Sequence, residues 1–524
     1  MNEYSIFIEL SFIVKVNKSF LHKYKMSIEK FFENQEIFIT GGSGFIGKGL
    51  LEKLLRSCPG VGKIYLLMRG KRTKSAKERL LDILNSILFD RVRSEQPAAL
   101  HKVYAIEGDC SEIGLALKPE DLEKIKNVNI IYHSAASVRF DDHLRDAILL
   151  NTRGTLEVIK LAEKLPHLKV FMHVSTTYSN PDRFEVDEKI YPAYADWRTT
   201  IKLAETYDQQ ILNVLAKKYS NYQPNTYTFT KGLAEQIVND YMDKLPIIVF
   251  RPSIVISSIF EPVPGWMDNF NGPNGLLVAC GIGILRTNYG NPDTLTDFVP
   301  VDIVVRCMIV ATYYKAMEVQ LKKSSLVAPK KIDVVNCATG LICPISMGRV
   351  IDLGKRLIQE NPFEKTLWVP GGSITKCRVW NLIRFTFLHI FTAIFVDTCL
   401  RISNRKPFLL RLQRRIFAAN LAVHYFSNRS WEFKNENFYL LHNTVSPEEF
   451  DTFGYLQYVQ IDYDEVFRKA IRGAKIFLLN EPADSSKGAR IRLQIFKFIN
   501  FLVQLIICLL IARFILRFIY IKFV

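Results

Sequence analysis

The sequence predicts an α/β fold, a doubly wound parallel sheet followed by a helical C-terminal domain and a C-terminal membrane-associated helix. Three observations lead to this fold class. A glycine cluster follows an apolar, strand-like segment in "EIFITGGSGFIG" (36–47), strand-like and helix-like segments then alternate to about residue 310, and the last residues are the most apolar of the chain. Strands that alternate with helices indicate βαβ units, whose sheet is parallel and covered on both faces.

The expected elements follow one another at short intervals. Strands are predicted at 36–40, 63–69, 102–109, 128–136, 169–176 and 246–255, and helices from Gly47 and at 73–88, 146–165 and 226–241. Each predicted strand is a short run of apolar and β-branched or aromatic residues, as expected for strands buried on both faces.

The length of 524 residues, 48% of them hydrophobic, favours two domains with appendages. We expect an N-terminal extension at 1–30, a cofactor-binding domain at 31–365, a smaller domain at 375–480 and an anchor at 495–524. The segment "GGSITK" (371–376) is the predicted linker. Residues 1–25 match a signal peptide poorly, because Glu9 and Lys15 interrupt their apolar run.

Charge and cysteine content narrow the class of protein. The net charge is +17, but the cations are scattered and form no zinc-finger, RNP-like or Lys/Arg-rich pattern, so nucleic acid is not the expected partner. A membrane surface or a phosphorylated ligand fits better. The nine cysteines are dispersed, odd in number and without a CxxC pair, which argues against a disulfide framework or a metal site and favours a reducing compartment.

Two apolar segments point to lipid. The first, 385–396, is too short to span a bilayer alone, and an interfacial helix, the lining of an acyl tunnel and a plain core helix all stay open. The second, Phe498 to Ala512, is followed by Arg513 and Arg517, and snorkelling of these arginines extends it to about 20 residues, enough to span. A buried core helix is the alternative for this terminal segment, but an all-round apolar helix at a terminus favours an anchor.

The glycine cluster is the first chemical motif. Gly41, Gly44 and Gly47 have the TGxxGxxG spacing, between a strand and a helix. Glycines there let the backbone approach a pyrophosphate, and the helix N-terminus offers free N–H groups and a partial positive charge. This context predicts a Rossmann-like dinucleotide site that includes Thr40, Phe45 and Ile46.

The ends of the next strands suggest which dinucleotide binds. An NAD site places an acidic residue after the second strand, whereas this chain has Arg69 and Lys71, which would attract a 2′-phosphate and favour NADPH. Asp109 ends the third strand and is predicted to accept from the adenine amino group. Small Ala135 and Ala136 end the fourth strand, where they would let a cofactor lie across the sheet edge.

A second motif predicts the proton donor. Tyr227 and Lys231 in "TYTFTKGLAE" are four residues apart, on one face of a helix. We expect the ammonium to stabilise the phenolate and lower its pKa. Ser175 and Thr176, at the end of the preceding strand, can hydrogen-bond a substrate carbonyl, and the residues alone do not choose between them.

These motifs resemble the extended short-chain dehydrogenase/reductase superfamily and, more narrowly, the alcohol-forming fatty acyl-CoA reductases. The segments that carry the resemblance are "FITGGSGFIGKGLLEKLLR", "IYLLMRGK", "AASVRFDD", "HVSTTYSN", "YTFTKGLAE", "RPSIV", "EPVPGWMDN" and "DFVPVDIVV", and "HYFSNRSWEFKNEN" in the C-terminal part. The resemblance covers about residues 30–480, and analogy with the superfamily favours Thr176 as the hydroxyl partner of Tyr227.

The resemblance implies NADPH-dependent reduction of a long-chain acyl-CoA to a fatty alcohol, with release of CoA and a bound aldehyde. It further implies an enzyme anchored by its C-terminus in the endoplasmic reticulum or peroxisome membrane, with the catalytic domain facing the cytosol. The alternative is another extended short-chain reductase or dehydrogenase that acts on a lipid or sterol. Membrane lipid is an expected partner, and a homo-oligomer stays open.

Overall fold

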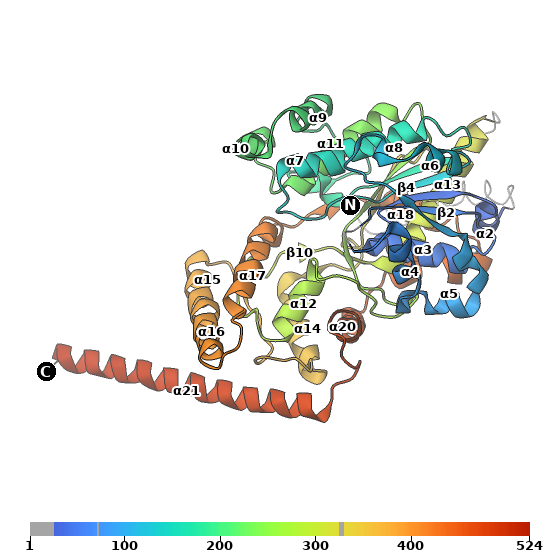
Figure 1. Ribbon diagram of the computed structural model, residues 1–524. Helices are drawn as coiled ribbons and strands as arrows, with labels where there is room; N and C mark the ends of the chain where they lie inside the picture. Colours follow the sequence, from blue (N-terminus) through green and yellow to red (C-terminus); the bar gives the residue numbers. More distant parts are fainter. Residues whose placement is uncertain (1–25, 71–72, 324–329, 524) are drawn as a thin grey trace, which may run out of the picture. The chain divides into compact units, whose positions relative to one another are not determined.

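The computed structural model describes residues 26–70, 73–323 and 330–523 (Figure 1). Residues 1–25 of the predicted N-terminal extension and Lys71 lie outside the described residues. The chain forms two compact units. Unit 1 comprises the described residues within Met1–Pro264, Leu295–Ile345 and Ser430–Ile461, and unit 2 those within Gly265–Thr294, Ser346–Arg429 and Asp462–Val524. The two units therefore interleave along the chain, whereas the sequence predicted domains that follow one another.

Unit 1 contains a seven-stranded sheet in the order β12-β7-β5-β4-β1-β2-β3. Its strands are β1 (Ile37–Thr40), β2 (Ile64–Met68), β3 (Val103–Glu107), β4 (Ile130–His133), β5 (Val170–Val174), β7 (Ile247–Pro252) and β12 (Val334–Cys337). All neighbouring pairs are parallel. The doubly wound parallel sheet is thus confirmed, with each of the six predicted strands in place, but β12 was not predicted.

Helices cover both faces of this sheet, which explains why β1 and β2 are buried along their whole length. On one face α3 (Phe45–Ser57) packs with α13 (Val301–Lys323), and α13 also contacts β5 and β7. On the other face α8 (Gly154–Ala162) and α11 (Thr226–Tyr241) pack together.

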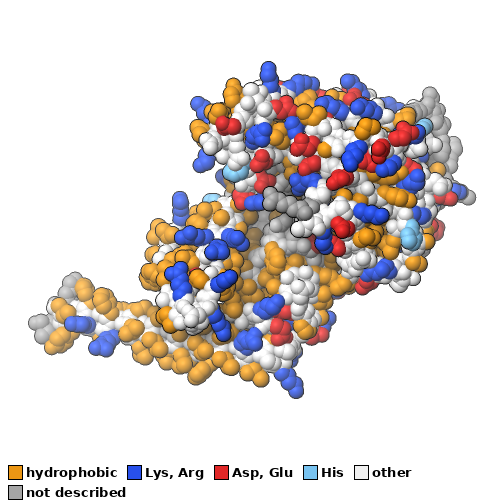
Figure 2. All heavy atoms as spheres, in the orientation of Figure 1, with side chains coloured by type: hydrophobic (Ala, Val, Ile, Leu, Met, Phe, Trp, Pro, Cys, Tyr) orange, Lys and Arg blue, Asp and Glu red, His pale blue; other side chains and the backbone are white. Residues whose placement is uncertain are grey.

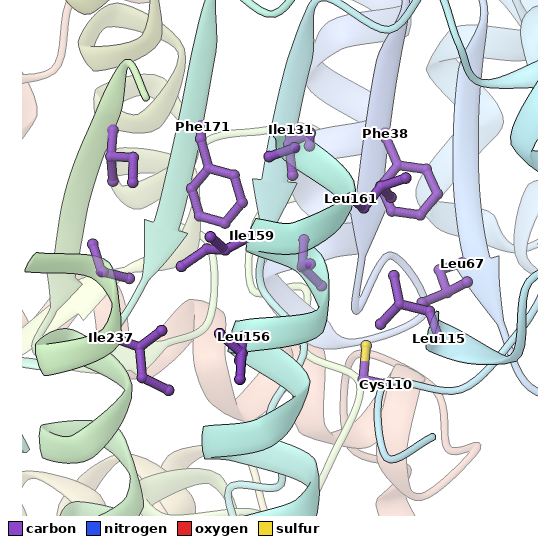
Figure 3. Close-up of a cluster of buried hydrophobic side chains, with 14 of the residues drawn as sticks. Phe38, Leu67, Cys110, Leu115, Ile131, Leu156, Ile159, Leu161, Phe171 and Ile237 are labelled. Atoms are coloured by element: carbon purple, nitrogen blue, oxygen red, sulfur yellow. The ribbon is translucent and has the colours of Figure 1, made fainter. Parts of the chain in front are cut away.

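Figure 3 shows the core beneath α8 and α11. Phe38, Ile131 and Phe171 come from three adjacent strands, and they meet Ile159 of α8 and Ile237 of α11 in one buried cluster. Side chains of a strand alternate between its faces, so these three residues occupy the same face of the sheet. This cluster fixes α11, the helix that carries Tyr227 and Lys231, against the sheet.

Unit 2 is mainly helical. Its helices α14 (Met347–Glu360) and α20 (Tyr463–Gly473) pack side by side, and ion pairs of Arg356 with Asp464 and of Arg468 with Glu360 join them. The helix α12 (Pro273–Gly281) lies against α14. The predicted linker at 371–376 is wrong, because its strand β14 (Ile374–Thr375) pairs with β9 (Asn288–Tyr289) inside unit 2.

Two helices of unit 2 are long and apolar enough to cross a membrane. One is continuous over Arg378–Ile402, formed by α15 (Arg378–Phe385), a π-helical turn (Thr386–Phe391) and α16 (Thr392–Ile402). The other is Lys487–Ile521, with a mean hydropathy of 2.5 over its best window, within α21 (Lys487–Phe523). The apolar run 385–396, too short to span alone, thus lies within a continuous helix of 25 residues.

Candidate active site

The glycine loop joins β1 to α3 at the point where the strand order reverses, between β4 and β2. Such switch points are where open parallel sheets bind ligands, beyond the carboxyl ends of their strands. Gly41 has φ +73°, and a Cβ there would lie 2.7 Å from the backbone of Ser134 and Ala135. A Cβ on Gly47 would lie 2.3 Å from the Gly41 carbonyl oxygen. Only glycine fits either position, so the loop folds back tightly over the first turn of α3.

Gly44 is the N-cap of α3, and it caps without a side chain. Phe45, Ile46 and Gly47 form the first turn, whose N–H groups have no partner within the helix. A glycine at the cap leaves this helix terminus open toward solvent, since Gly44 itself is exposed. The open loop and helix terminus have the geometry that a pyrophosphate site requires, and contact of these residues with a cofactor stays a prediction.

Thr40 supports the loop from below. Its buried hydroxyl lies 2.8 Å from His133 Nδ1 and accepts a hydrogen bond from the Ala135 N–H at 3.2 Å. Burial lowers the pKa of His133 to about 3, so this imidazole is neutral. Thr40 thus ties the end of β1 to the segment with Ala135 and Ala136, both half-buried, and its hydroxyl is already engaged.

Arg69 and Asp109 are brought together, although 40 positions separate them in the sequence. Arg69 Nη1 lies 3.6 Å from Asp109 Oδ2, and the Arg69 side chain is 63% exposed. The other carboxylate oxygen of Asp109 accepts hydrogen bonds from the Ser111 N–H and hydroxyl, both at 2.9 Å. The exposed guanidinium lies just past the end of β2, where a cofactor ribose would lie in a fold of this kind.

Tyr227 and Lys231 lie one turn apart near the start of α11, whose N-cap Asn225 accepts from the Thr228 N–H at 2.8 Å. The Lys231 ammonium is buried and donates to the Val174 carbonyl oxygen at 2.6 Å. Burial lowers the pKa of Lys231 to about 8. The Tyr–Lys pair is therefore assembled at the carboxyl end of β5, as the motif predicted.

The expected lowering of the Tyr227 pKa is wrong. Burial raises the pKa of Tyr227 to about 12, a hydrogen bond from Thr176 opposes the rise, and the charge of Glu235 adds to it. The physical reason is the direction of Lys231, whose ammonium is bound to the Val174 carbonyl oxygen of the strand. A spacing of four residues placed the two side chains on one face but did not fix where the ammonium points.

The two candidate hydroxyls have different partners. The Ser175 hydroxyl donates to Glu235 Oε1 at 2.5 Å, whereas Thr176 hydrogen-bonds Tyr227. Glu235 is buried and also accepts from Arg251, at 2.9 Å from Nε and 2.6 Å from Nη2. Ser175 is thus part of a buried charged network, and Thr176 is the hydroxyl beside the phenol.

Sequence reasoning missed Glu235, Arg251 and Asn151. The signal for Arg251 was a charge inside an otherwise apolar strand, which usually marks a buried pair, whereas Glu235 lies in a helix of mixed polarity that gives no such signal. Asn151 lies in a π-helical segment (Ile148–Arg153) and donates to Thr230 Oγ1 at 3.0 Å while accepting from the Ser137 N–H at 2.9 Å. It links the loop after β4 to α11, and π-helical segments are frequent at functional sites.

The fold and the site together define an oxidoreductase that uses a nicotinamide cofactor. A glycine cradle at the switch point of a parallel sheet stands beside a Tyr–Lys pair and a hydroxyl at the neighbouring strand ends.

Comparison with known proteins narrows this class. A family model described as male sterility protein, of the NAD-binding kind, matches residues 39–308, and a second with the same description matches residues 388–481. Fatty acyl-CoA reductase 1 of Rattus norvegicus is 37% identical over 493 residues, 93% of each chain. Fatty acyl-CoA reductase 2 of Mus musculus is 34% identical over 487 residues, again 93% of each. The chain belongs to the fatty acyl-CoA reductase family.

A solved structure shares the fold at low identity. The reductase domain of a nonribosomal peptide synthetase from Mycobacterium tuberculosis superposes with a TM-score of 0.56 and 19% identity, covering 85% of this chain and 93% of that one. At this identity the likeness supports the Rossmann-like architecture alone.

Proposed function

We propose that this chain reduces long-chain fatty acyl-CoA to fatty alcohol with NADPH, releases CoA, and holds the aldehyde until the second reduction. The observation that carries the proposal is the Tyr227–Thr176 hydrogen bond beside the buried Lys231, at the sheet edge that also bears the glycine cradle. Membership of the fatty acyl-CoA reductase family supports the acyl-CoA substrate.

In this proposal the Tyr227 hydroxyl binds the substrate carbonyl with the support of Thr176. Tyr227 accepts a hydrogen bond from Thr176 and would donate its own proton toward the oxygen where negative charge develops, which is the general logic of an oxyanion site. Each of two NADPH molecules would supply one hydride when bound: the first to the thioester carbonyl, whose tetrahedral adduct then expels CoA as thiolate, and the second, after NADP⁺ has been exchanged for fresh NADPH, to the aldehyde. Tyr227 then protonates the alkoxide of the alcohol, and Lys231 holds positive charge nearby.

The preference for NADPH is proposed from Arg69. Its guanidinium is largely exposed just beyond β2, so it can reach a 2′-phosphate while Asp109 stays at 3.6 Å to steady it. Charge-assisted contacts of a guanidinium with phosphate are strong and geometrically specific. Asp109 is then the proposed partner of the adenine amino group, and Lys71 a second cation toward the phosphate.

The enzyme is proposed to sit on a membrane through α21, in the endoplasmic reticulum or peroxisome, with unit 1 in the cytosol. The support is the apolar part of α21, whose described side chains from residue 501 to 521 are all exposed. Such an anchor would keep the site close to a long acyl chain that partitions into lipid.

Product analysis tests the proposal directly. The purified enzyme is given saturated and unsaturated acyl-CoAs of increasing length, and alcohol, free CoA and NADPH consumption are measured together. Two NADPH oxidised per CoA released, with alcohol as product, is the expected result. One NADPH per CoA with free aldehyde, or NADPH oxidation without CoA release, would contradict it. Tyr227→Phe removes the proton donor and should abolish turnover while leaving NADPH binding intact.

A further inference from the structure

The helix Arg378–Ile402 buries two polar side chains among its inner residues and exposes an apolar stripe on its outer face. Its buried residues recur every four positions, and they are Phe385, His389, Ala393 and Asp397. Its outer stripe consists of exposed residues at helical spacing: Trp380, Ile383, Phe387, Phe391, Phe395 and Ile402. The helix of a water-soluble surface has the opposite pattern, with apolar residues inside and polar ones outside.

Hydrogen bonds fix this orientation. His389 Nδ1 lies 2.8 Å from Gln413 Oε1 of α17 (Leu409–Val423), and His389 Nε2 accepts from the Arg286 N–H at 3.2 Å. The Asp397 carboxylate accepts three backbone N–H groups at the start of α17, from Phe408 to Leu410, at 2.9 to 3.0 Å. Rotating the helix to hide the outer stripe would leave these buried polar groups unpaired, at a cost of about 1–3 kcal/mol each.

The hairpin formed by Arg378–Ile402 and α17 is also strongly basic. Between residues 378 and 423 there are eight Lys and Arg residues and a single carboxylate, that of Asp397, which gives a formal net charge of +7. Exposed cations such as Arg405, Lys406 and Arg414 therefore accompany the exposed aromatic residues. In Figure 2 basic and hydrophobic side chains intermingle over this part of unit 2.

The base of α21 is attached at the same place. Arg286 Nη2 lies 3.5 Å from Asn500 Oδ1, to which Trp368 Nε1 also donates at 3.3 Å, and the Arg286 backbone holds His389. Arg286 thus contacts both the hairpin and α21. From residue 501 to 521 every side chain of α21 is exposed.

We propose that the hairpin 378–423 is a second membrane contact, lying in the interface of the bilayer that holds α21. The side chains of the outer stripe would insert into the acyl layer, and the Lys and Arg residues would bind anionic headgroups. Apolar residues mixed with many cations and almost no carboxylates are typical of interfacial helices on anionic lipid. The hairpin lies on the membrane and does not cross it, because its buried polar groups bind it to the rest of unit 2: His389 accepts from the Arg286 N–H, and Gln413 donates to the Ile284 carbonyl oxygen at 3.1 Å.

Tryptophan quenching in the full-length chain tests this proposal without depending on catalysis. The protein is reconstituted into vesicles of phosphatidylcholine and phosphatidylserine, with and without brominated acyl chains. The emission of Trp380, which is 52% exposed, is obtained as the difference between wild type and Trp380→Phe. Trp197→Phe gives the matched control, since Trp197 is buried in unit 1 and donates to Asp240 at 3.1 Å.

We expect brominated lipid to quench the Trp380 emission and aqueous iodide to leave it unchanged, while the Trp197 emission responds to neither. Replacing two outer residues, in Phe387→Ser/Phe395→Ser, should lower the lipid quenching of Trp380 by at least about two-fold, because the stripe loses apolar area. Val214→Ser, at an exposed apolar site of unit 1, should not change it. Quenching by iodide alone would put the stripe in water, and quenching by neither would show a protein cover; both results overturn the proposal.

Discussion

Gly47→Ala tests the glycine cradle most directly. The added Cβ would lie 2.3 Å from the Gly41 carbonyl oxygen and 2.7 Å from the Gly42 Cα. A normal carbon–oxygen contact is about 3.3 Å or more, so the loop must move by roughly 1 Å. Gly41 cannot move back to make room, because the backbone of Ser134 and Ala135 already closes that side.

Gly47→Ala should change the cofactor Kd much more than the free energy of unfolding. Overpacking costs about 1–3 kcal/mol, and alanine in a helix regains about 1 kcal/mol over glycine, so the free energy of unfolding should fall by roughly 0–2 kcal/mol. A shift of about 1 Å breaks hydrogen bonds from the loop and the first turn of α3 to the pyrophosphate. Two such charge-assisted bonds are worth about 3 kcal/mol, which raises the cofactor Kd by roughly 100-fold.

The assay is NADPH titration by calorimetry, together with a thermal melt of each protein. Gly354→Ala in α14 is the control, because its Cβ would meet only Leu277 at an ordinary 3.8 Å. It should bind NADPH as wild type does and melt at the same temperature or higher. Gly47→Ala with wild-type affinity for NADPH would refute the role of this loop in holding the pyrophosphate.

Four further predictions concern the remaining site residues and the anchor. The basic limb of the kcat–pH profile should lie near pH 8, because the Lys231 ammonium loses its proton as pH rises through its lowered pKa of about 8. Lys231→Arg should remove that limb. An unchanged limb in this variant would contradict the assignment. Thr176→Ala should lower kcat by roughly 10-fold or more with a modest fall in melting temperature, because its hydroxyl also accepts from the Tyr178 N–H at 3.2 Å. Ser175→Ala should lower the melting temperature by disturbing a buried network and change kcat less, and the reverse pattern of kcat losses would exchange their roles. Arg69→Ala should weaken NADPH binding by roughly 10-fold and NADH binding little, and equal losses would exclude contact with the 2′-phosphate. Deleting residues 501–524 removes only exposed side chains of α21 among those described, and should make the membrane-bound protein extractable by alkaline carbonate; resistance to extraction would place the anchor elsewhere.

Much of the sheet could be predicted because its strands are short apolar runs bounded by glycine or polar residues. The strand β12 was not predicted, although Val334–Cys337 is a short, largely apolar run like the other strands. Among the described residues it pairs with β7 alone, more than eighty positions earlier, and it follows the long helix α13 with no glycine motif to mark it. Pairing over such a distance is decided by packing in three dimensions, which a local pattern does not contain.

The site was predicted as a set of residues but not as a set of contacts. The choice between Ser175 and Thr176 depends on Glu235, sixty positions later, which takes the Ser175 hydroxyl and leaves Thr176 beside Tyr227. The direction of Lys231 likewise depends on a carbonyl of β5. Helical spacing fixes which residues share a face, and only the packed structure shows which atoms of that face are already bonded.

The hydropathy of the segment 385–396 was equally ambiguous. A window average counts His389 and Asp397 as interruptions of an apolar run, whereas in the structure they are the inner contacts that hold the helix in place. The informative quantity is which residues face outward, and that depends on partners in α17 and near Arg286. Composition could therefore suggest lipid without distinguishing a core helix from an interfacial one.

The raised pKa of Tyr227 bears on the direction of the reaction. A phenol with a pKa of about 12 keeps its proton at neutral pH, which is the form that donates to a developing alkoxide. Alcohol oxidation would instead need the phenolate as a base, and burial disfavours that charged form. The Lys231 ammonium donates to the Val174 carbonyl oxygen, so it stabilises the phenolate less than an ammonium without this hydrogen bond would. The raised pKa therefore keeps Tyr227 in the protonated form that its proposed role as proton donor requires at neutral pH.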